Sequence, residues 1–373
     1  MRFGFMPKGI ARSVNEFSIE VICMLRDREK KMVDAIIEKA KRACADSLAM
    51  VGVYGSFATG DVHEKSDLDL LILIDDERGY QLAHAFILDD VGIGYDLYCT
   101  TWQRLEEDAQ CRHPHLGKLL DSQIVYMRHA EDGERLNALR EQAIATLASP
   151  VRFERAGAAL AKAKCAYADC ATALTLHQAR ASAAEMISYV LDAVMLYHGR
   201  YFRRGVKRAF EETRQLNLPF DLREMILCII RAETAGDVIR AATDALRDVT
   251  AALPFSSEKA APAAANLAGT YEEMYSNWRG KMAEAYERND LFASFMNLAW
   301  FQGMLQGISG EVDIPQFPIL GRFDSVHLER NAALFDDTLA EYEAVYRQAG
   351  IDPVHYRDVD AFVQAYAESG KRA

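Results

Sequence analysis

The chain has 373 residues, of which half are hydrophobic and 26% are charged, so it contains enough apolar residues for ordinary globular cores. Its formal net charge of −12 excludes the broad basic surface with which proteins bind DNA or RNA non-specifically. The length predicts two or three domains.

Cysteine usage and hydropathy predict a cytoplasmic protein. The seven cysteines are scattered, and no Cys/His spacing is typical of a zinc site, which favours free thiols. Residues 1–8 lack the long apolar segment of a secretion signal. No run approaches the ~18 apolar residues that a membrane-spanning helix needs.

The first 130 residues predict a small mixed sheet flanked by helices. An amphipathic helix is expected over residues 27–45, a short helix from Ser56 and another over residues 102–111. Residues 81–88 are compatible with a helix or a strand. Strands are expected over residues 48–54, 69–74, 94–99 and, at an edge, 122–127.

After residue 130 the chain is rich in Ala, Leu and Glu, and the pattern predicts helices. These are expected over residues 134–146, 151–176, 178–200, 222–231, 236–253, 270–306 and 328–349. Residues 256–269 contain Pro262 and many alanines, which indicates a linker or a break between helices. The sequence therefore predicts an α+β protein with a mixed-sheet domain at 1–130, a helical bundle at 131–255 and a further helical lobe at 270–373.

The most informative pattern lies between residues 55 and 74. A predicted strand ends at Gly55-Ser56, a loop follows, and Asp67-Leu68-Asp69 leads into a second apolar strand. Two carboxylates at positions i and i+2 of an extended segment point to the same face, where they can hold Mg²⁺ against a triphosphate. A Gly-Ser turn that opens a helix offers free backbone N–H groups to phosphates.

This combination resembles the nucleotidyltransferase superfamily that includes DNA polymerase beta and the aminoglycoside and lincosamide nucleotidyltransferases. The resemblance covers residues 45–130 and implies that 1–130 is the catalytic domain and that the bundle at 131–255 binds the acceptor. Asp96 matches the family's third carboxylate in position and in its apolar surroundings. The other matching residues are Gly55, Ser56, Gly60, Ser66, Asp67 and Asp69.

The resemblance also implies a role for each residue. Asp67 and Asp69 would ligate two Mg²⁺ ions, and Asp96 would complete the metal site beside the acceptor hydroxyl and help to deprotonate it. Gly55, Ser56 and Ser66 would hold the phosphates of ATP or another NTP. Lys65 either touches a phosphate or is a solvated loop lysine.

Two features of the helical half are open to a functional or a structural interpretation. Residues 200–208 carry five cations in nine positions, which indicates either a contact with nucleotide phosphates or cations placed at the C-terminus of a helix. Glu185 lies on an otherwise apolar predicted helix. It is a candidate general base for the acceptor hydroxyl, or a surface glutamate.

We therefore expect an enzyme that transfers AMP from Mg-ATP to a hydroxyl of a small molecule and releases pyrophosphate. The acceptor would be an aminoglycoside-like or lincosamide-like antibiotic or another metabolite. Two alternatives remain: a nucleotidyltransferase that adenylylates another protein, as small antitoxin nucleotidyltransferases do, and a non-catalytic nucleotide sensor. Neither a nucleic-acid primer nor a membrane partner is expected, because the chain lacks an extended basic surface and a membrane span.

Overall fold

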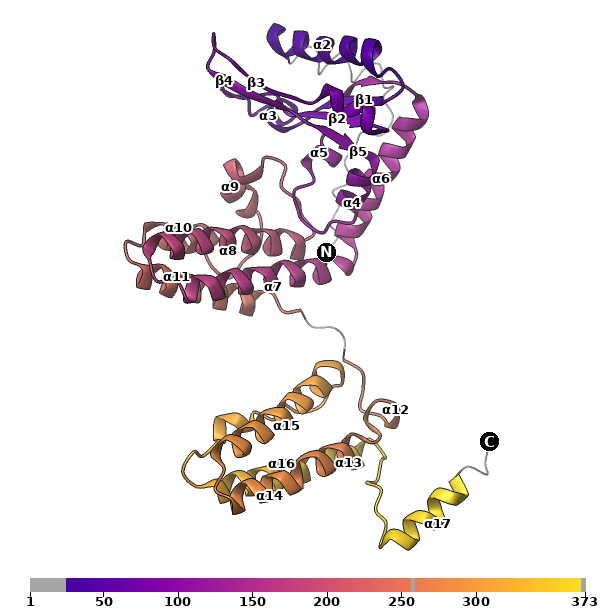
Figure 1. The fold of residues 1–373 in the computed structure, drawn as a ribbon, viewed down its shortest axis with the longest axis vertical. Helices are drawn as coiled ribbons and strands as arrows, with labels where there is room; N and C mark the ends of the chain where they lie inside the picture. The colour runs from indigo at the N-terminus through magenta and orange to yellow at the C-terminus, as the bar shows by residue number, and fades with distance from the viewer. Residues whose placement is uncertain (1–24, 256–258, 370–373) are drawn as a thin grey trace. The chain divides into compact units, whose positions relative to one another are not determined.

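The computed structural model describes residues 25–255 and 259–369 (Figure 1). Residues 1–8 and Cys23, on which the sequence predictions drew, lie outside these ranges. The chain divides into two compact units, one up to Phe255 and the other from Ser256 onward. A small mixed sheet comes early in the chain and helices follow it, so the predicted α+β class is confirmed.

The first unit is built on a four-stranded sheet with the order β5-β2-β1-β6. Strand β1 is antiparallel to β2 and β6, and β2 is parallel to β5. Every residue of β1 and β2 is buried, as expected for central strands that are covered on both faces. The strands are β1 (Leu48–Val53), β2 (Leu70–Ile74), β5 (Cys99–Thr101) and β6 (Gln123–Met127), and a separate hairpin pairs β3 (His84–Leu88) with β4 (Ile93–Leu97).

Helices cover both faces of the four-stranded sheet (Figure 1). On one face, α2 (Asp27–Ala43) packs its apolar stripe against residues that include Ile72. On the other face, α4 (Trp102–Ala109) and α6 (Ala130–Ala148) share a core with Leu71. Alternate residues of β2 therefore enter two different cores, as a strand between two helical layers requires.

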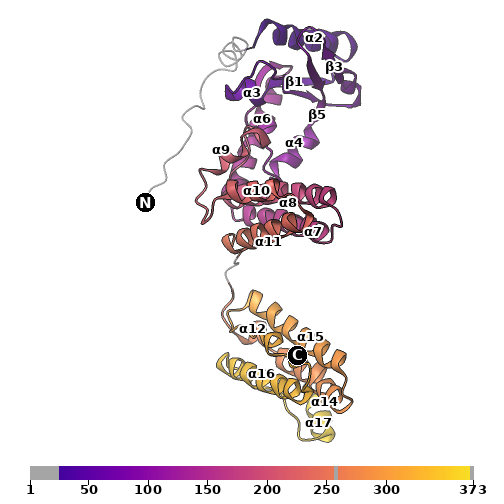
Figure 2. The ribbon, with the colours of Figure 1, turned by 90° about the vertical axis from the view of Figure 1, so that its left-hand side faces the viewer.

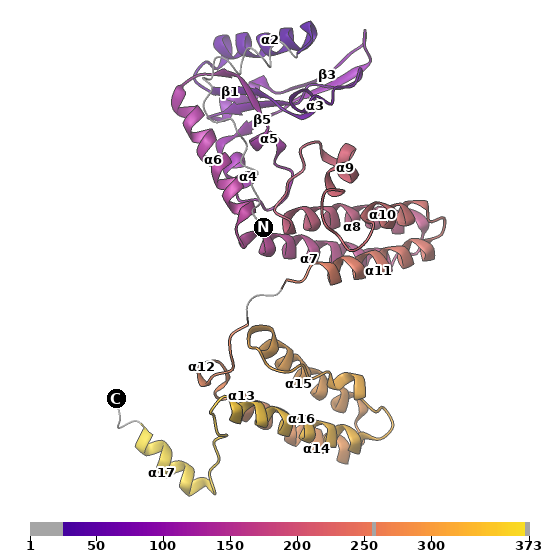
Figure 3. The same cartoon turned by 180° about the vertical axis from the view of Figure 1, so that it is seen from behind.

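Four longer helices form a bundle (Figure 2). Its core continues into the sheet. One cluster of buried side chains extends from Leu71 in β2 to Val249 in the last bundle helix. The short helix α9 (Ala209–Thr213) lies between the bundle and the sheet (Figure 3). The bundle consists of α7 (Val151–Ala171), α8 (Leu176–Tyr197), α10 (Leu222–Arg231) and α11 (Ala235–Ala252).

The second unit is helical and has its own core, which includes Phe301, Phe335 and Tyr342. The segment 259–269, within the predicted linker, contains a short helix and a β-bridge from Ala260 to Val312, so it belongs to this unit. The helices of the unit are α12 (Ala264–Leu267), α13 (Thr270–Met274), α14 (Gly280–Glu287), α15 (Leu291–Glu311), α16 (Leu328–Gln348) and α17 (Val359–Ser369).

Most predicted elements are confirmed, and the differences have local causes. The helical stretch 270–306 is interrupted, because Asn289 has a φ of +50° and Asp290 caps the start of α15 through the N–H of Ala293. The ambiguous residues 81–88 end a 3₁₀ turn and then form β3. The short helix α9 and the terminal α17 were not predicted. No helix in the described ranges is long and apolar enough to cross a membrane.

Candidate active site

A pocket of about 590 Å³ lies in the first unit, between the sheet and the helical segments that follow it. Five residues predicted from the sequence lie in its wall and come from one short stretch: Gly55, Ser56, Ser66, Asp67 and Asp69. Other wall residues come from later segments, among them Arg104, Asp108, His113, His115, Lys118, Phe202, Arg203, Arg204 and Lys207. The structure therefore brings the predicted motif together with residues from the helical part of the chain.

The turn at Gly55 is built around the carboxylate of Asp69. Gly55 has a φ of +65°, and a Cβ at this position would lie 1.9 Å from Oδ2 of Asp69. The backbone N–H of Ser56 donates a hydrogen bond to the Asp69 carboxylate. The Oγ of Ser56 is buried at the pocket and has no hydrogen-bond partner among the described residues. This hydroxyl is therefore free to bind a ligand.

Asp67 and Asp69 face the pocket from an extended segment that immediately precedes β2. Leu68 between them is buried, with 3% of its surface exposed, so the two carboxylates point away from that core. Burial, and then the charge of Asp67, raise the pKa of Asp69 to about 6. Neither carboxylate forms an ion pair within the part of the chain that the structure describes.

This acid pair fits a magnesium ion that is shared with a substrate. Mg²⁺ is commonly bound by one or two carboxylates, together with substrate phosphates and water. Among the described residues, no three His, Cys, Asp or Glu side chains gather into a metal-binding group. Asp67 and Asp69 would therefore be the protein ligands, and phosphate oxygens and water would supply the others.

Asp96 is not brought into the pocket, although the sequence placed it in the metal site. It is exposed in β4, which pairs with β3 in the separate hairpin. The parallel pairing of β2 with β5 begins at Ile72 and Cys99, three residues after Asp69 and Asp96 respectively. Asp96 belongs to the hairpin, because the chain joins the central sheet only at Cys99, and Asp96 is not among the residues that line the pocket.

Two tyrosines lie beside the acid pair instead. Tyr98 lines the pocket, and its hydroxyl lies 2.6 Å from that of Tyr54. Burial and the contact with Tyr98 raise the pKa of Tyr54, and the charge of Asp69 adds to this effect. The hydroxyl of Tyr54 therefore stays protonated at neutral pH.

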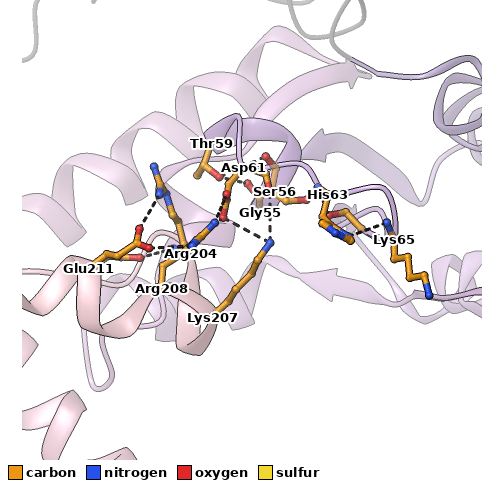
Figure 4. A network of polar contacts seen from close by, with 12 residues as sticks. Gly55, Ser56, Thr59, Asp61, His63, Lys65, Arg204, Lys207, Arg208 and Glu211 are labelled. Carbon is orange, nitrogen blue, oxygen red and sulfur yellow. Dashed lines mark hydrogen bonds and ion pairs between the residues drawn. The ribbon is translucent and has the colours of Figure 1, made fainter. Parts of the chain in front are cut away.

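Lys65 and Glu185 also lie outside the set of pocket-lining residues. Lys65 is exposed, and Figure 4 shows its side chain extending away from the labelled cluster around Asp61. Its backbone N–H donates to Nδ1 of His63 at 3.1 Å, so this residue shapes the loop through its backbone. Glu185 is exposed on α8 and does not reach the pocket.

The basic stretch packs onto the end of the Gly-Ser turn (Figure 4). Asp61 follows the turn directly, and Nε and Nη2 of Arg208 donate to its carboxylate at 2.9 and 2.7 Å. Nζ of Lys207 lies 3.6 Å from the same carboxylate, and Arg208 also contacts Glu211. The hydrogen bonds from Arg208 hold the pKa of Asp61 well below its usual range. Arg204 and Lys207 therefore line the pocket from a segment that is anchored to the motif.

Several wall residues with ionisable side chains were not predicted from the sequence, among them Asp108, His113, His115 and Lys118. Lys118 is largely buried, which lowers its pKa, and it lies 3.8 Å from Asp108 and 5.5 Å from the ring of Tyr98. His113 and His115 flank Pro114 in the loop after α4. The pair of histidines around a proline was the one signal in the sequence that could have indicated them. Asp108 and Lys118 gave no such signal.

A family profile matches the part of the chain that contains the Gly-Ser turn and the acid pair. Residues 33–121 match the family profile described as the nucleotidyltransferase domain. The match spans the Gly-Ser turn and the acid pair. A solved nucleotidyltransferase-like protein from Exiguobacterium sibiricum is 14% identical over 73% of this chain and 89% of that chain, with a TM-score of 0.36. The search of curated proteins gave no match.

Proposed function

We propose that the protein is a metal-dependent nucleotidyltransferase that moves AMP from Mg-ATP to a hydroxyl of a small molecule and releases pyrophosphate. The observation that carries this proposal is the acid pair at Asp67 and Asp69. Both carboxylates lack a cationic partner in the described structure, and both face a pocket whose opposite wall is basic. A triphosphate with bound Mg²⁺ complements both walls, because its cation faces the acids and its phosphates face the cations.

Different residues of the pocket wall would bind different parts of the donor. When bound between Asp67, Asp69 and the triphosphate, Mg²⁺ would offset the negative charge that develops during transfer. The unpartnered Ser56 Oγ would donate to a phosphate oxygen. Lys118, Arg204 and Lys207 would balance the charge of the leaving pyrophosphate. Asp61 and Arg208 hold the basic segment at the correct distance from the turn.

The size of the pocket also supports a small molecule as the acceptor. Its volume of about 590 Å³ falls within the range of ligand pockets, roughly 300–1,000 Å³. The net charge of −12 argues against a nucleic-acid primer. The six cysteines within the described ranges are all free, which is consistent with our placing the activity in the reducing cytoplasm, where NTPs are available.

A protein acceptor is a second candidate, and exposed apolar side chains on the second unit favour it. Along α15, Phe292 and Trp300 are 74% and 54% exposed, and Leu291 and Phe295 are also exposed. Exposed apolar side chains of this kind are typical of surfaces that bind other proteins. If the acceptor is a protein, the chemistry at Asp67 and Asp69 is unchanged, and the hydroxyl belongs to a protein side chain instead of a small molecule.

Pyrophosphate release tests the proposal directly. Each of the four NTPs is offered with Mg²⁺ and a panel of aminoglycosides, lincosamides and simple sugars, with Asp67→Asn/Asp69→Asn as the blank. We expect release that depends on one acceptor class, is largest with ATP and vanishes in the blank. Mg-ATP binding without release from any member of the panel would favour a protein acceptor or a nucleotide sensor. Equal release by the wild type and the blank would contradict the proposal.

A further inference from the structure

His115 is held in the pocket by contacts from two other segments. Its ring stacks on that of Phe202, with 5.4 Å between the centroids and an interplanar angle of 21°. Its Nε2 lies 3.0 Å from Oδ1 of Asp192 on α8. The backbone N–H of Phe202 donates to the carbonyl of Pro114 at 2.8 Å, which ties the histidine loop to the same segment. The position of the ring is therefore fixed by packing and by charge.

This arrangement leaves one nitrogen of the His115 ring available to accept a proton. His115 is the only ion-pair partner of Asp192 within the described ranges, and the Asp192 side chain is only 13% exposed. In the neutral imidazole, a proton on Nε2 facing the carboxylate leaves the lone pair on Nδ1. Nδ1 makes no hydrogen bond to any described residue, and the His115 side chain is 48% exposed at the pocket wall.

Other titratable groups of the wall are committed to partners. Asp61 is bound by Arg208 and Lys207. Asp108 lies within 3.8 Å of a nitrogen of each of Arg104, His113 and Lys118. Tyr54 is kept protonated by its raised pKa, and its hydroxyl contacts that of Tyr98. Nε2 of His113 lies 3.4 Å from Asp108, and its Nδ1 is buried. With Asp67 and Asp69 assigned to the metal, His115 is therefore the wall group best placed to take a proton.

We propose that His115, oriented by Asp192, is the general base that takes the proton from the acceptor hydroxyl. This inference rests on the proposed nucleotidyl transfer. As the acceptor oxygen bonds to the α-phosphorus, its proton moves to Nδ1 of His115. The bond between the α-phosphorus and the bridging oxygen breaks, and its electron pair leaves with pyrophosphate. Asp192 is a positioning residue, and the loop around Pro114 together with Phe202 marks the acceptor end of the pocket.

The electrostatic surroundings predict how this base responds to pH. The contact with Asp192 raises the pKa of His115, and burial partly opposes this effect. The wall also carries His113, whose ring centroid lies 6.0 Å from that of His115, and the charged residues Asp108, Lys118 and Arg203. Because the neutral imidazole is the base, activity should rise with pH through the pKa of His115. Removal of the Asp192 charge should move this rise to lower pH.

The test compares His115→Gln and Asp192→Asn with His84→Gln, which changes an exposed histidine of β3 that does not line the pocket. Pyrophosphate release from Mg-ATP is measured against pH with kanamycin, lincomycin, glucose and glycerol as acceptor probes, and Mg-ATP affinity is measured by calorimetry. We expect His115→Gln to bind Mg-ATP like the wild type and to lose about 10²–10⁴-fold in release. Asp192→Asn should retain more activity and shift the rising limb of its pH profile to lower pH.

The outcomes separate this inference from the proposed function. An active wild type whose rate and pH profile are unchanged in His115→Gln would overturn the assignment of the base alone. If His115→Gln does not fold, an unshifted pH profile in folded Asp192→Asn would overturn it as well. A wild type that neither binds Mg-ATP nor releases pyrophosphate with any probe would overturn both proposals.

Discussion

The two walls of the pocket differ in how far apart in the sequence their interacting residues lie. On the sheet wall, Gly55, Ser56 and Asp69 contact one another within a single turn and loop. The helical wall comes from the segment around residues 202–208, where Arg208 binds Asp61, a residue that lies 147 positions earlier in the sequence. The two acids that would bind the metal are therefore specified by a local pattern, whereas Arg204 and Lys207 line the pocket from a segment that is distant in the sequence. The following predictions test this contrast.

The largest effect is expected from the acid pair. Asp67→Asn/Asp69→Asn removes the two carboxylates that would hold Mg²⁺. Because bound metal contributes several kcal/mol of transition-state stabilisation, we expect pyrophosphate release to fall by about three orders of magnitude. Glu64→Gln, at an exposed position of the same loop outside the pocket, is the matched control. A comparable loss of pyrophosphate release in this control would show that release responds to any change in the loop, and not specifically to the loss of the acid pair.

The next effect concerns the close contact at Gly55. Gly55→Ala and Gly60→Ala place a Cβ at positions with φ of +65° and +71°, and only the first of these atoms collides with Asp69. Gly60→Ala should lower the free energy of unfolding by about 1–2 kcal/mol through backbone strain alone. Gly55→Ala should in addition displace Asp69 and reduce release by about 10²-fold or more, since small displacements of reacting groups have effects of this size. Thermal unfolding and pyrophosphate release of the two variants check this. Equal activity losses would contradict the role assigned to the Gly55 contact.

A smaller effect is expected where the two walls meet. Asp61→Asn removes the carboxylate that binds Arg208 and Lys207, so the basic segment should lose its anchor on the Gly-Ser turn. We expect the dissociation constant of Mg-ATP to rise about threefold to tenfold, because the contact is charge-assisted but partly exposed. Glu211→Gln is the control, since it contacts Arg208 without reaching the turn. If calorimetry finds the same affinity for Mg-ATP in Asp61→Asn and in the wild type, the anchored basic segment does not contribute to donor binding.

The smallest effect is the pH dependence of stability at His115. Contact with Asp192 raises the pKa of His115 above its ordinary value of 6.5, so the folded state binds this proton more tightly than the unfolded chain. The resulting stabilisation is fully present below pH 6.5 and is lost as the pH rises through the raised pKa. Because His115 is half-exposed, we expect Asp192→Asn to cost less than about 1 kcal/mol, and to cost more at pH 5 than at pH 8. Urea unfolding at the two pH values measures this, and the opposite order would show that the ion pair does not stabilise the fold.

Much of the fold follows from periodicity, because the central strands and long helices bury continuous apolar faces. Strands β1 and β2 and helices such as α10 lie where the pattern placed them. The short helix α9 has no such signal, since it is too short to show a helical repeat. The hydrophobic pattern likewise could not show that Asp96 lies in a hairpin outside the central sheet, because β4 is apolar in alternation whichever strand it pairs with.

The sequence by itself determined the chemistry of the sheet wall. Gly55, Ser56, Asp67 and Asp69 are recognisable because a tight turn and an extended segment fix their relative positions through local backbone geometry. Only the tertiary structure decided the opposite wall, which brings Lys118, His115 and the Asp61–Arg208 contact to the pocket. The tertiary structure also places Asp192, and not Glu185, of α8 in contact with the pocket residue His115. These positions depend on how the bundle packs against the sheet, and such packing is set by shape and burial over the whole core rather than by residue spacing.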